Sequence, residues 1–481
     1  MKTLNEQIQP LFIGGEWVRT PDTHEIFNKY TGDLFVRVGK AGPGEADRAI
    51  EAARKALTET PLPPANRFQI LHRVHQLLLE RADELAECIA KEGGKPIRDA
   101  RTEVNRSATV FLLSAQEAAR IRGELIPTQV APHFDIGQRL IYTIKKPVGI
   151  VCAITPFNFP LNLVAHKVAP ALAAGNAVIL KPASDTAFTA LKLCKLLEEA
   201  GLPKGYMSCL VGSGSTLGER LLEDPRIGMY TFTGSPEVGK HIRNKVGLRR
   251  VTLELGSNSA SIVHNDADIE KAAAKLARMS FAHAGQICIS VQRIYVHREV
   301  EEAFMEAFLR HTAGLKVGDP LDPGTDVGPM ISEKEAIRAE TWVREAVAGG
   351  ARIATGGKRE KNVYFPTVLV NATKGMKVVD EEVFAPVVSV AAYDDIREAV
   401  RMANDSKYGL QAGVFTKSIN LAHRIPHWLE VGGVIINDTS SFRADQMPYG
   451  GVKDSGMGRE GPAFAVEEML ETVTVVVNLD E

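Results

Sequence analysis

The sequence predicts an α/β fold that is organised around a parallel, doubly wound sheet. Segments with the period of a strand alternate with segments with the period of a helix along most of the chain. The strand segments are short and apolar throughout, as in parallel strands that are buried on both faces. With 481 residues, 44% of them apolar, the chain is long enough for two or three domains, each with its own core.

The βα repeats are clearest in the middle of the chain, where each predicted strand is followed by a helix. Strands that are connected in this way become parallel neighbours in one sheet. We expect strands over 148–154, 177–180, 207–211 and 229–232, and helices over 162–173, 185–200 and 215–222.

Helical periodicity precedes this region, and a second βα-rich unit follows it after about residue 256. No repeat, low-complexity tract or long linker separates the units. The predicted helices before the repeats cover 45–60, 64–92 and 99–120, and those of the second unit lie near 268–283, 299–313 and 333–349.

Two further segments, 139–144 and 472–477, have the pattern of exposed strands. An exposed apolar strand needs a partner that covers its edge. We therefore expect these two strands to pair within or between subunits, and we expect the protein to be an oligomer.

Charge and cysteine content narrow the classes of partner and site. A formal net charge of −2 gives no basic surface for nucleic acid or anionic membrane, so small molecules are the expected partners. Neither a signal peptide nor an apolar run of about 18 residues is visible, so a soluble, cytoplasmic protein is expected. The spacing of the five cysteines is neither that of a disulfide framework nor that of a metal site. They are Cys88, Cys152, Cys194, Cys209 and Cys288.

The cysteine that follows Gly285-Gln286-Ile287 is a candidate nucleophile. Its thiol has an ordinary pKa of about 8.5, so Cys288 needs a base or a positive field to supply thiolate at neutral pH. Glu254, in the segment Leu253-Glu254-Leu255-Gly256, is a candidate for that base. The alternative is that Cys288 is a small buried apolar residue, which is the commoner use of a single cysteine.

Two glycine-containing turns are candidates for a phosphate site. The segment 211–218 nearly matches GxGxxG, but its last glycine comes one residue late, which makes the match weak. In the segment 230–239 a strand leads into Ser235, a favourable N-cap, and Pro236 takes the first helical position. The free N–H groups of such a helix start can bind a pyrophosphate, although an ordinary capped helix has the same pattern.

Lys181 and Asn158 follow two of the predicted strands. Lys181 ends the strand 177–180 at the carboxyl edge of the sheet, where open α/β folds bind ligands. A lysine there can bond ribose hydroxyls or simply be solvated. Asn158 lies between Pro156 and Pro160, and an amide fixed in this way can stabilise an oxyanion or form an Asx turn.

Eight motifs in the family's order make the chain closely resemble the aldehyde dehydrogenase superfamily over nearly its whole length. Within the superfamily, the sequence resembles the lactaldehyde, non-phosphorylating glyceraldehyde-3-phosphate and semialdehyde dehydrogenase groups. The motifs are KPVG at 146–149, PFNFP at 156–160, ALAAGNAVILKPAS at 171–184, FTGS at 232–235, LELGSNSA at 253–260, GQICIS at 285–290, EEVFAP at 381–386 and MPYGGVKDSGMGREG at 447–461.

The resemblance implies a Rossmann-like cofactor domain, an α/β catalytic domain and a small β oligomerisation domain. On this basis we expect a homodimer or homotetramer without a bound metal. The expected cofactor-binding domain covers 1–124 and 148–256, the catalytic domain covers 257–452, and the oligomerisation strands cover 125–147 and 469–481.

The resemblance also implies the chemistry. Cys288 would attack an aldehyde to give a thiohemiacetal, and the Asn158 side chain and the Cys288 N–H would hold its oxyanion. After hydride transfer, Glu254 would activate the water that hydrolyses the thioester. Glu471 matches a second glutamate that is a weaker candidate for a proton relay.

The implied cofactor is NAD or NADP. Ser184 stands where many NAD-specific relatives carry a glutamate that repels a 2′-phosphate, so we expect use of NADP as well, although Asp185 adds a nearby negative charge. The residues implied to contact the cofactor are Thr155, Pro156, Phe157, Lys181, Ser184, Thr233, Gly234, Ser235, Leu255, Glu382 and Phe384. Ala385 and Ser257 replace glycines that are usual in the pattern, and either side chain would narrow a close backbone approach.

The positions that match the substrate tunnel of relatives are Arg106, Phe159 and Arg443. Two guanidinium groups near one tunnel suit a carboxylate, phosphate or sulfonate on a short aldehyde. We therefore expect a short hydroxylated or anionic aldehyde as substrate. In the alternative, one or both arginines form surface or intersubunit ion pairs. A CoA-acylating dehydrogenase and a non-catalytic scaffold on the same fold are the other functions that we weigh.

Overall fold

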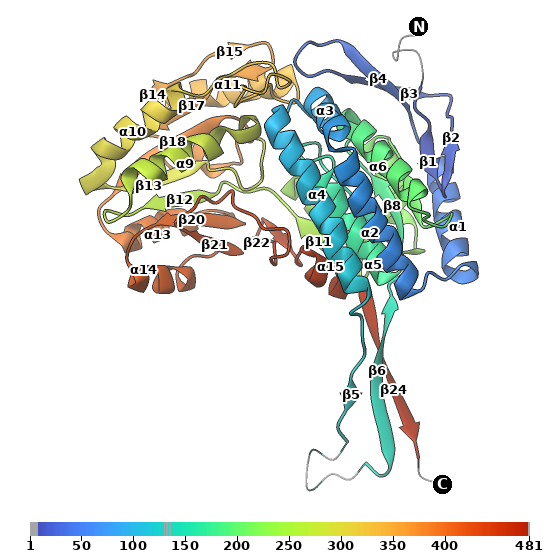
Figure 1. Cartoon of the computed structure of the whole chain (residues 1–481). Helices are drawn as coiled ribbons and strands as arrows, with labels where there is room; N and C mark the ends of the chain where they lie inside the picture. Colours follow the sequence, from blue (N-terminus) through green and yellow to red (C-terminus); the bar gives the residue numbers. More distant parts are fainter. Residues whose placement is uncertain (1–7, 129, 131–132, 134–135, 480–481) are drawn as a thin grey trace.

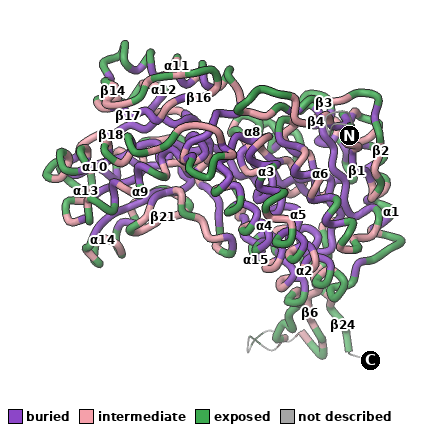
Figure 2. The backbone as a smooth tube through the Cα atoms, turned by 45° about the horizontal axis from the view of Figure 1, so that its top comes forward, coloured by how far each residue is buried: buried purple, intermediate pink, exposed green. Residues whose placement is uncertain are grey.

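The computed structural model describes residues 8–128, 130, 133 and 136–479, and it has two lobes and a projecting arm (Figure 1). Some residues of the predicted domains therefore lie outside the described residues. They are 1–7, 480–481 and, in the arm, five positions between 129 and 135. Buried backbone runs through both lobes, whereas the arm is mostly exposed (Figure 2).

The first lobe contains an eight-stranded sheet whose five central strands are parallel. This arrangement confirms the predicted doubly wound α/β fold, with antiparallel strands only at the two edges. In spatial order the strands are β2 (Glu16–Val18), β1 (Leu11–Ile13), β9 (Met207–Cys209), β8 (Ala177–Lys181), β7 (Ile150–Ile154), β10 (Ile227–Thr233), β11 (Arg250–Glu254) and β23 (Gly456–Met457).

The register of these strands brings their carboxyl ends to one edge. Ile154 pairs with Lys181 and with Phe232, and Thr233 pairs with Glu254. The helices of this lobe are α1 (Pro43–Glu59), α2 (Pro64–Glu80), α3 (Ala82–Gly93), α4 (Ile97–Ala118), α5 (Asn162–Ala174), α6 (Ala187–Glu199), α7 (Glu219–Glu223), α8 (Pro236–Val246) and α15 (Pro462–Glu468).

Three of the predicted helices differ in the structure. The helix expected over 64–92 is two helices, because the backbone leaves the helical region at Arg81 (φ −115°, ψ 25°). The helix expected over 185–200 begins with a 3₁₀ turn at Ser184–Thr186, and the one expected over 215–222 begins with a π turn at Gly214–Gly218. Neither turn is visible in apolar periodicity, since each depends on the local hydrogen-bond register.

The second lobe contains a seven-stranded sheet in which only the edge strand β14 is antiparallel. Its order is β14 (Arg352–Thr355), β17 (Thr367–Val370), β18 (Val387–Tyr393), β13 (Arg293–His297), β12 (Ala260–Val263), β20 (Gln411–Phe415) and β21 (Gly433–Ile436). Its helices are α9 (Ile269–Phe281), α10 (Glu301–Ala313), α11 (Glu333–Ala348), α12 (Lys377–Asp380), α13 (Ile396–Asn404) and α14 (Ile419–Arg424).

The arm is a three-stranded antiparallel sheet. Its strands are β5 (Leu125–Ile126), β6 (Arg139–Pro147) and β24 (Leu470–Asn478), and β24 and β6 pair along their whole lengths. The two predicted arm strands therefore pair within the chain. Smaller two-stranded sheets join β3 (Thr23–Phe27) to β4 (Leu34–Gly39), β15 (Arg359–Glu360) to β16 (Val363–Tyr364), and β19 (Tyr408–Gly409) to β22 (Val452–Lys453).

Among the described residues, no helix has both the length and the apolar character that a membrane span requires.

Candidate active site

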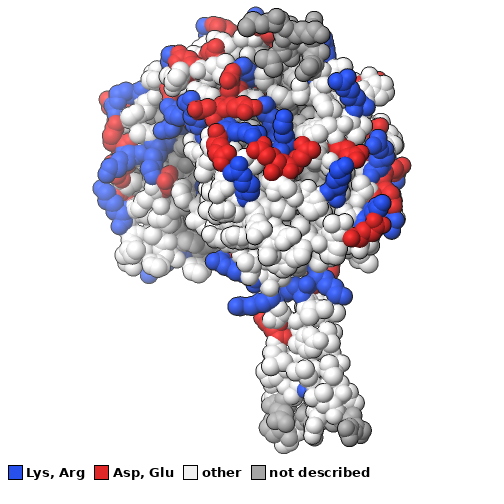
Figure 3. All heavy atoms as spheres, turned by 45° about the vertical axis from the view of Figure 1, so that its right-hand side comes forward, with Lys and Arg blue, Asp and Glu red and all other residues white. Residues whose placement is uncertain are grey.

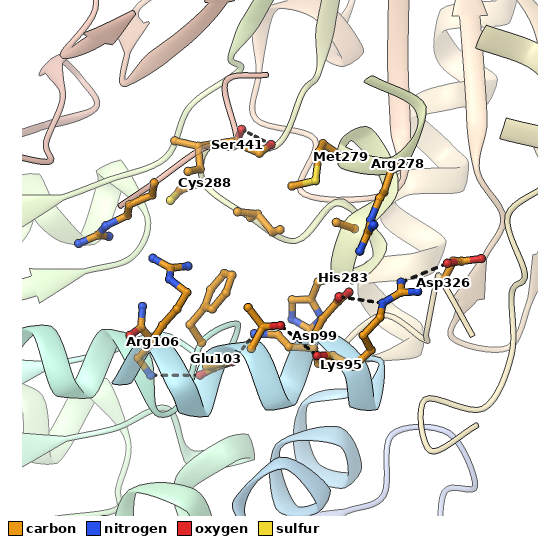
Figure 4. Close-up of a pocket in the computed structure, with 18 of the residues that line it drawn as sticks. Lys95, Asp99, Glu103, Arg106, Arg278, Met279, His283, Cys288, Asp326 and Ser441 are labelled. Atoms are coloured by element: carbon orange, nitrogen blue, oxygen red, sulfur yellow. Dashed lines mark hydrogen bonds and ion pairs between the residues drawn. The ribbon is translucent and has the colours of Figure 1, made fainter. Parts of the chain in front are cut away.

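A cavity of about 390 Å³ lies where the two lobes meet. Figure 4 shows Cys288 and Ser441 on one wall, with Glu103 and Arg106 of α4 on the facing wall. Phe159, Arg443 and Tyr449 also line this cavity. The structure thus brings Cys288 together with all three predicted substrate contacts, which lie far apart in the sequence.

The loop that carries Cys288 has an unusual backbone. His283, Ala284 and Gly285 have φ values of 48°, 53° and 69°, in the left-handed region that costs energy for residues other than glycine. A side chain at Gly285 would come within 2.1 Å of the Ala385 carbonyl oxygen, so glycine is required there. This close approach joins the cysteine loop to the segment that contains Glu382 and Phe384.

Cys288 differs from the other four cysteines, because it is only partly buried and they are buried. Its Sγ lies 3.0 Å from the Tyr449 hydroxyl oxygen. Burial raises the pKa of the Cys288 thiol to about 12, although the Tyr449 hydrogen bond acts in the opposite direction. The thiol is therefore protonated at neutral pH until a base removes its proton.

Glu254 ends β11 and is buried, and neither of its carboxylate oxygens has a hydrogen-bond partner among the described residues. Burial, and then the charge of Glu460, raise its pKa, while Arg443 and Lys167 lower it. A side chain at Gly450 would come within 2.8 Å of Glu254 Oε1, so the carboxylate lies against the Tyr449-Gly450 segment. Its raised proton affinity suits a general base.

Asn158 follows β7 and is buried. Its side-chain amide donates a hydrogen bond to the Gln286 carbonyl oxygen at 2.8 Å, two residues before Cys288. The Asn158 side chain therefore faces the cysteine loop and does not form an Asx turn. The amide has a second N–H, which is the group that an oxyanion would use.

Four neighbouring parallel strands bring polar side chains to one edge of the first sheet. Lys181 ends β8, Thr155 follows β7, Thr233 ends β10 and Glu254 ends β11. The buried hydroxyls of Thr155 and Thr233 have no hydrogen-bond partner among the described residues. Such unpaired groups at the carboxyl edge of an open α/β sheet fit a bound dinucleotide.

The start of α8 adds the expected anion site at the same edge. Ser235 caps this helix, and its Oγ accepts a hydrogen bond from the Val238 N–H at 3.4 Å. Gly234 lies against the Phe232 ring, where a side chain would come within 2.4 Å, and Gly239 lies equally close to Leu255. Glycines therefore allow the helix start to pack against the sheet.

Glu382 and Phe384 reach the site from the second lobe. Glu382 is half-buried, and loss of solvation raises its pKa to about 7, while its Oε1 accepts a hydrogen bond from the Ser257 N–H at 3.0 Å. The Phe384 ring packs edge-to-face on Phe157 with centroids 5.9 Å apart. The Ser257 hydroxyl lies 3.2 Å from the Ser259 hydroxyl, so this unusual serine bonds Ser259 while its amide holds Glu382.

The residue after Ser184, Asp185, carries a negative charge that nearby side chains partly balance. The Asp185 carboxylate lies 3.8 Å from Lys29 Nζ and 3.8 Å from His24 Nε2. These neighbours lower the pKa of Asp185, which is ionised, so its negative charge is partly balanced where it stands.

Arg106 is held by a chain of buried groups. Its Nε and Nη2 donate to the two Asp445 carboxylate oxygens at 3.1 and 2.8 Å. Asp445 Oδ1 also lies 3.0 Å from His166 Nε2, and burial lowers the pKa of His166 to about 4, so this histidine is neutral. The remaining guanidinium nitrogen, Nη1, has no partner among the described residues.

Arg443 is more deeply buried than a surface ion pair would be, with a side chain that is 6% exposed. Its Nη2 donates to Glu460 at 3.1 Å, and its Cζ lies 3.7 Å from the centroid of the Tyr449 ring. Phe159 packs under Lys95, whose Nζ lies 3.4 Å from the ring centroid.

Four further residues of this region were not predicted from the sequence to belong to the site. Tyr449 and Glu460 lie inside the motif at 447–461, but the motif alone does not indicate what each of them contacts. Lys167 donates a hydrogen bond to Glu460 at 2.6 Å. Arg278 of α9 lines the cavity without an ion pair or hydrogen bond among the described residues. By contrast, Glu471 is exposed on β24 and bonds Arg250 at 2.8 Å, so it lies on the arm and outside this cavity.

The model of the aldehyde dehydrogenase family matches residues 17–475 of this chain. The 3-sulfolactaldehyde dehydrogenase of Priestia aryabhattai is 52% identical over 469 residues, which are 98% of each chain. The lactaldehyde dehydrogenase of Methanococcus maripaludis is 41% identical over 97% of this chain and all of its own.

A solved structure shows the same architecture. The glyceraldehyde-3-phosphate dehydrogenase GapN of Methanocaldococcus jannaschii, complexed with NADP, superposes with a TM-score of 0.91 at 39% identity, covering 95% of this chain and 100% of that one. Fold, sequence and site geometry lead to one conclusion. The chain belongs to the aldehyde dehydrogenase family, and it is an oxidoreductase that acts on aldehydes.

Proposed function

We propose that this enzyme oxidises a short hydroxylated aldehyde with an anionic end, of the type of 3-sulfolactaldehyde, to the carboxylic acid with NAD or NADP. The observation that carries the proposal is one cavity that is lined by the Cys288 thiol and, among its arginines, by the guanidinium groups of Arg106 and Arg443. The 3-sulfolactaldehyde and lactaldehyde dehydrogenases among the relatives support a substrate of three carbons.

In the proposed reaction Cys288 attacks the aldehyde carbon. The free N–H of Asn158 and the backbone N–H of Cys288 hold the oxyanion of the thiohemiacetal. Glu254 accepts the thiol proton, releases it to solvent before hydrolysis, and then deprotonates the water that hydrolyses the thioester. Its unpaired oxygens and raised pKa support this double use.

The dinucleotide would lie along the carboxyl edge of the eight-stranded sheet. Its nicotinamide supplies the hydride acceptor when it is bound. Lys181 and Glu382 would hold the ribose hydroxyls, the start of α8 at Gly234 and Ser235 the pyrophosphate, and Ser184 would face the adenosine ribose. The other predicted contacts are Thr155, Pro156, Phe157, Thr233, Leu255 and Phe384.

Anion recognition is proposed for the guanidinium groups. Asp445 fixes Arg106 through Nε and Nη2 and leaves Nη1 for the substrate. Arg443 faces the same cavity from the other lobe, with its charge partly balanced by Glu460. A sulfonate, phosphate or carboxylate would complete the hydrogen bonds of these groups.

The domain divisions are part of the proposal. The first lobe would bind the dinucleotide, the second would carry the thiol, and the arm would join subunits of a homodimer or homotetramer. On the face that Figure 3 shows, few charged side chains lie along the arm. Exposed apolar residues on it include Leu125, Leu140, Val476 and Val477, which a partner subunit would cover.

The test is a comparison of substrates with the purified enzyme in the absence of CoA. We expect 3-sulfolactaldehyde to give free acid with a kcat/KM at least about 100-fold above that of propanal, since a paired guanidinium contact contributes about 2–3 kcal/mol. Arg106→Ala should remove most of this preference, and Arg278→Ala serves as a cationic control in the same cavity.

Equal losses for the anionic aldehyde and propanal in Arg106→Ala would contradict the anion site. A strict requirement for CoA would identify the acylating reaction, and a lack of turnover with every aldehyde would favour the scaffold.

A further inference from the structure

We infer that Tyr449 is a further catalytic residue, whose hydroxyl donates a hydrogen bond to the Cys288 sulfur whenever that sulfur carries negative charge. The inference rests on the proposed role of Cys288 as nucleophile. The two residues line the same cavity, and the oxygen and sulfur atoms are 3.0 Å apart.

Tyr449 is fixed in place by its backbone and by its ring. Its N–H donates to the Glu460 carbonyl at 3.0 Å, and the Glu460 N–H donates back at 2.7 Å. The Arg443 guanidinium stacks on the ring and is itself tied to Glu460. Since the side chain is only 2% exposed, the phenol has little freedom to turn away from the sulfur.

The phenol is suited to act as a donor. Burial raises the pKa of Tyr449 well above its ordinary value, so the hydroxyl keeps its proton over the working pH range of an enzyme. The Arg443 cation on the ring acts in the opposite direction, which polarises the O–H bond and strengthens the hydrogen bond that it donates.

The thiolate needs such a donor, because burial and two of its three charged neighbours disfavour a negative charge on sulfur. Burial and the carboxylates of Glu382 and Glu254 raise the pKa of Cys288, whereas the Tyr449 hydrogen bond and the Arg443 charge lower it. Among the described residues, the Tyr449 hydroxyl is the side-chain group within hydrogen-bond distance of Sγ, and a thiolate can only accept from it.

The donor would act at two points of the reaction. In the first, the thiol proton passes to Glu254 and the Sγ–C bond forms while the carbonyl π electrons move to oxygen. In the second, after Glu254 has released that proton to solvent, a water oxygen bonds to the thioester carbon, a water proton passes to Glu254, and the C–S bond breaks with both electrons on sulfur. Tyr449 stabilises the sulfur anion before the first bond forms and after the second breaks.

The experiment compares the wild type with Tyr449→Phe, which keeps the ring under Arg443 and removes only the hydroxyl. The rate of iodoacetamide alkylation is measured against pH, with Cys288 identified as the labelled site by mass spectrometry. We expect the thiol pKa to rise by about one unit and alkylation at pH 7 to slow about tenfold, with kcat/KM lower by a similar factor.

Tyr206→Phe is the matched control, because the Tyr206 hydroxyl donates to the Thr60 carbonyl at 3.0 Å in the first lobe. It should leave the alkylation profile unchanged. An unchanged thiol pKa in folded Tyr449→Phe would overturn the inference. If alkylated Cys288 leaves aldehyde oxidation intact, the proposed function fails, whatever the Tyr449 result is.

Discussion

At residue 184 a single side chain bears on the choice between NAD and NADP. Ser184 is neutral and begins a short 3₁₀ turn just beyond Lys181, and the next charge, that of Asp185, is partly balanced by Lys29 at 3.8 Å. A glutamate at 184 would therefore add the uncompensated negative charge that the wild type lacks.

We predict that Ser184→Glu lowers kcat/KM for NADP about tenfold or more, since repulsion between close charges is about 1–2 kcal/mol near a protein surface. For NAD the change should stay within about twofold, on the same order-of-magnitude reasoning. Steady-state titration with each cofactor measures this, and Ser184→Gln is the uncharged control of equal size. The same NADP loss in both variants would show that size and not charge decides.

The pKa of Glu254, the proposed base, also bears on the stability of the protein. Its pKa is raised above the ordinary 4.5, so the native state holds its proton more tightly than the unfolded chain does. The stability that this carboxyl contributes is fully present below pH 4.5 and is lost as the pH rises through its folded pKa.

We therefore predict that Glu254→Gln raises the free energy of unfolding at pH 8 by on the order of 1 kcal/mol, while removing turnover. The gain should be small at pH 5 and should grow with pH. Denaturant unfolding at a series of pH values measures it. A gain that does not depend on pH would mean that the carboxylate is not destabilised by burial.

At the scale of elements, the start of α5 positions Asn158. The Glu103 carboxylate of α4 accepts hydrogen bonds from the Leu161 and Asn162 N–H groups at 2.9 and 3.1 Å, and it is paired with the buried Lys95. This contact ties α4 to the segment that follows Asn158, so the loop is fixed by a buried ion pair.

We predict that Glu103→Gln costs about 3 kcal/mol of stability, because it leaves Lys95 charged, buried and unpaired. The double variant with Lys95→Met should recover more than half of that loss. Unfolding of the two single variants and the double variant gives the coupling energy. Additive losses would show that the two side chains are not coupled.

The elements whose position follows from local sequence pattern were predictable from the sequence. The apolar strand β8 ends in a lysine that a proline follows, and β10 is followed by a helix cap, so the carboxyl edge could be located. The break at Arg81 and the π turn at Gly214–Gly218 were not, because neither changes the spacing of apolar residues.

At the scale of the whole molecule, the cavity requires both lobes. Arg106, His166 and Asp445 meet although up to 339 positions separate them, and the 3.0 Å contact of Tyr449 with Cys288 spans 161 positions. The family motifs predict Cys288 and Glu254 as the thiol and its base, but the partners of Arg106 and Arg443 depend on how the lobes pack, which spacing along the chain does not show.

The arm is the part of the molecule that needs another subunit in our account. We predict that Val476→Lys combined with Val477→Lys weakens subunit association about 100-fold or more, since a buried interface would then hold unpaired charges. Light scattering after size-exclusion chromatography measures the mass. A wild-type enzyme that is monomeric at micromolar concentration would contradict the proposed role of the arm.

In the proposed mechanism Cys288 carries the acyl group, and Glu254→Gln isolates this step because hydrolysis should stop at the thioester. Mixing of this variant with aldehyde and NAD or NADP should give one equivalent of reduced cofactor per active site and then cease. The burst should be slower than in the wild type, because the Cys288 thiol proton must then pass to solvent. Mass spectrometry of the quenched protein should find the acyl group on the peptide with Cys288. A full burst with no acyl group on that peptide, or with the group on another cysteine, would contradict the account.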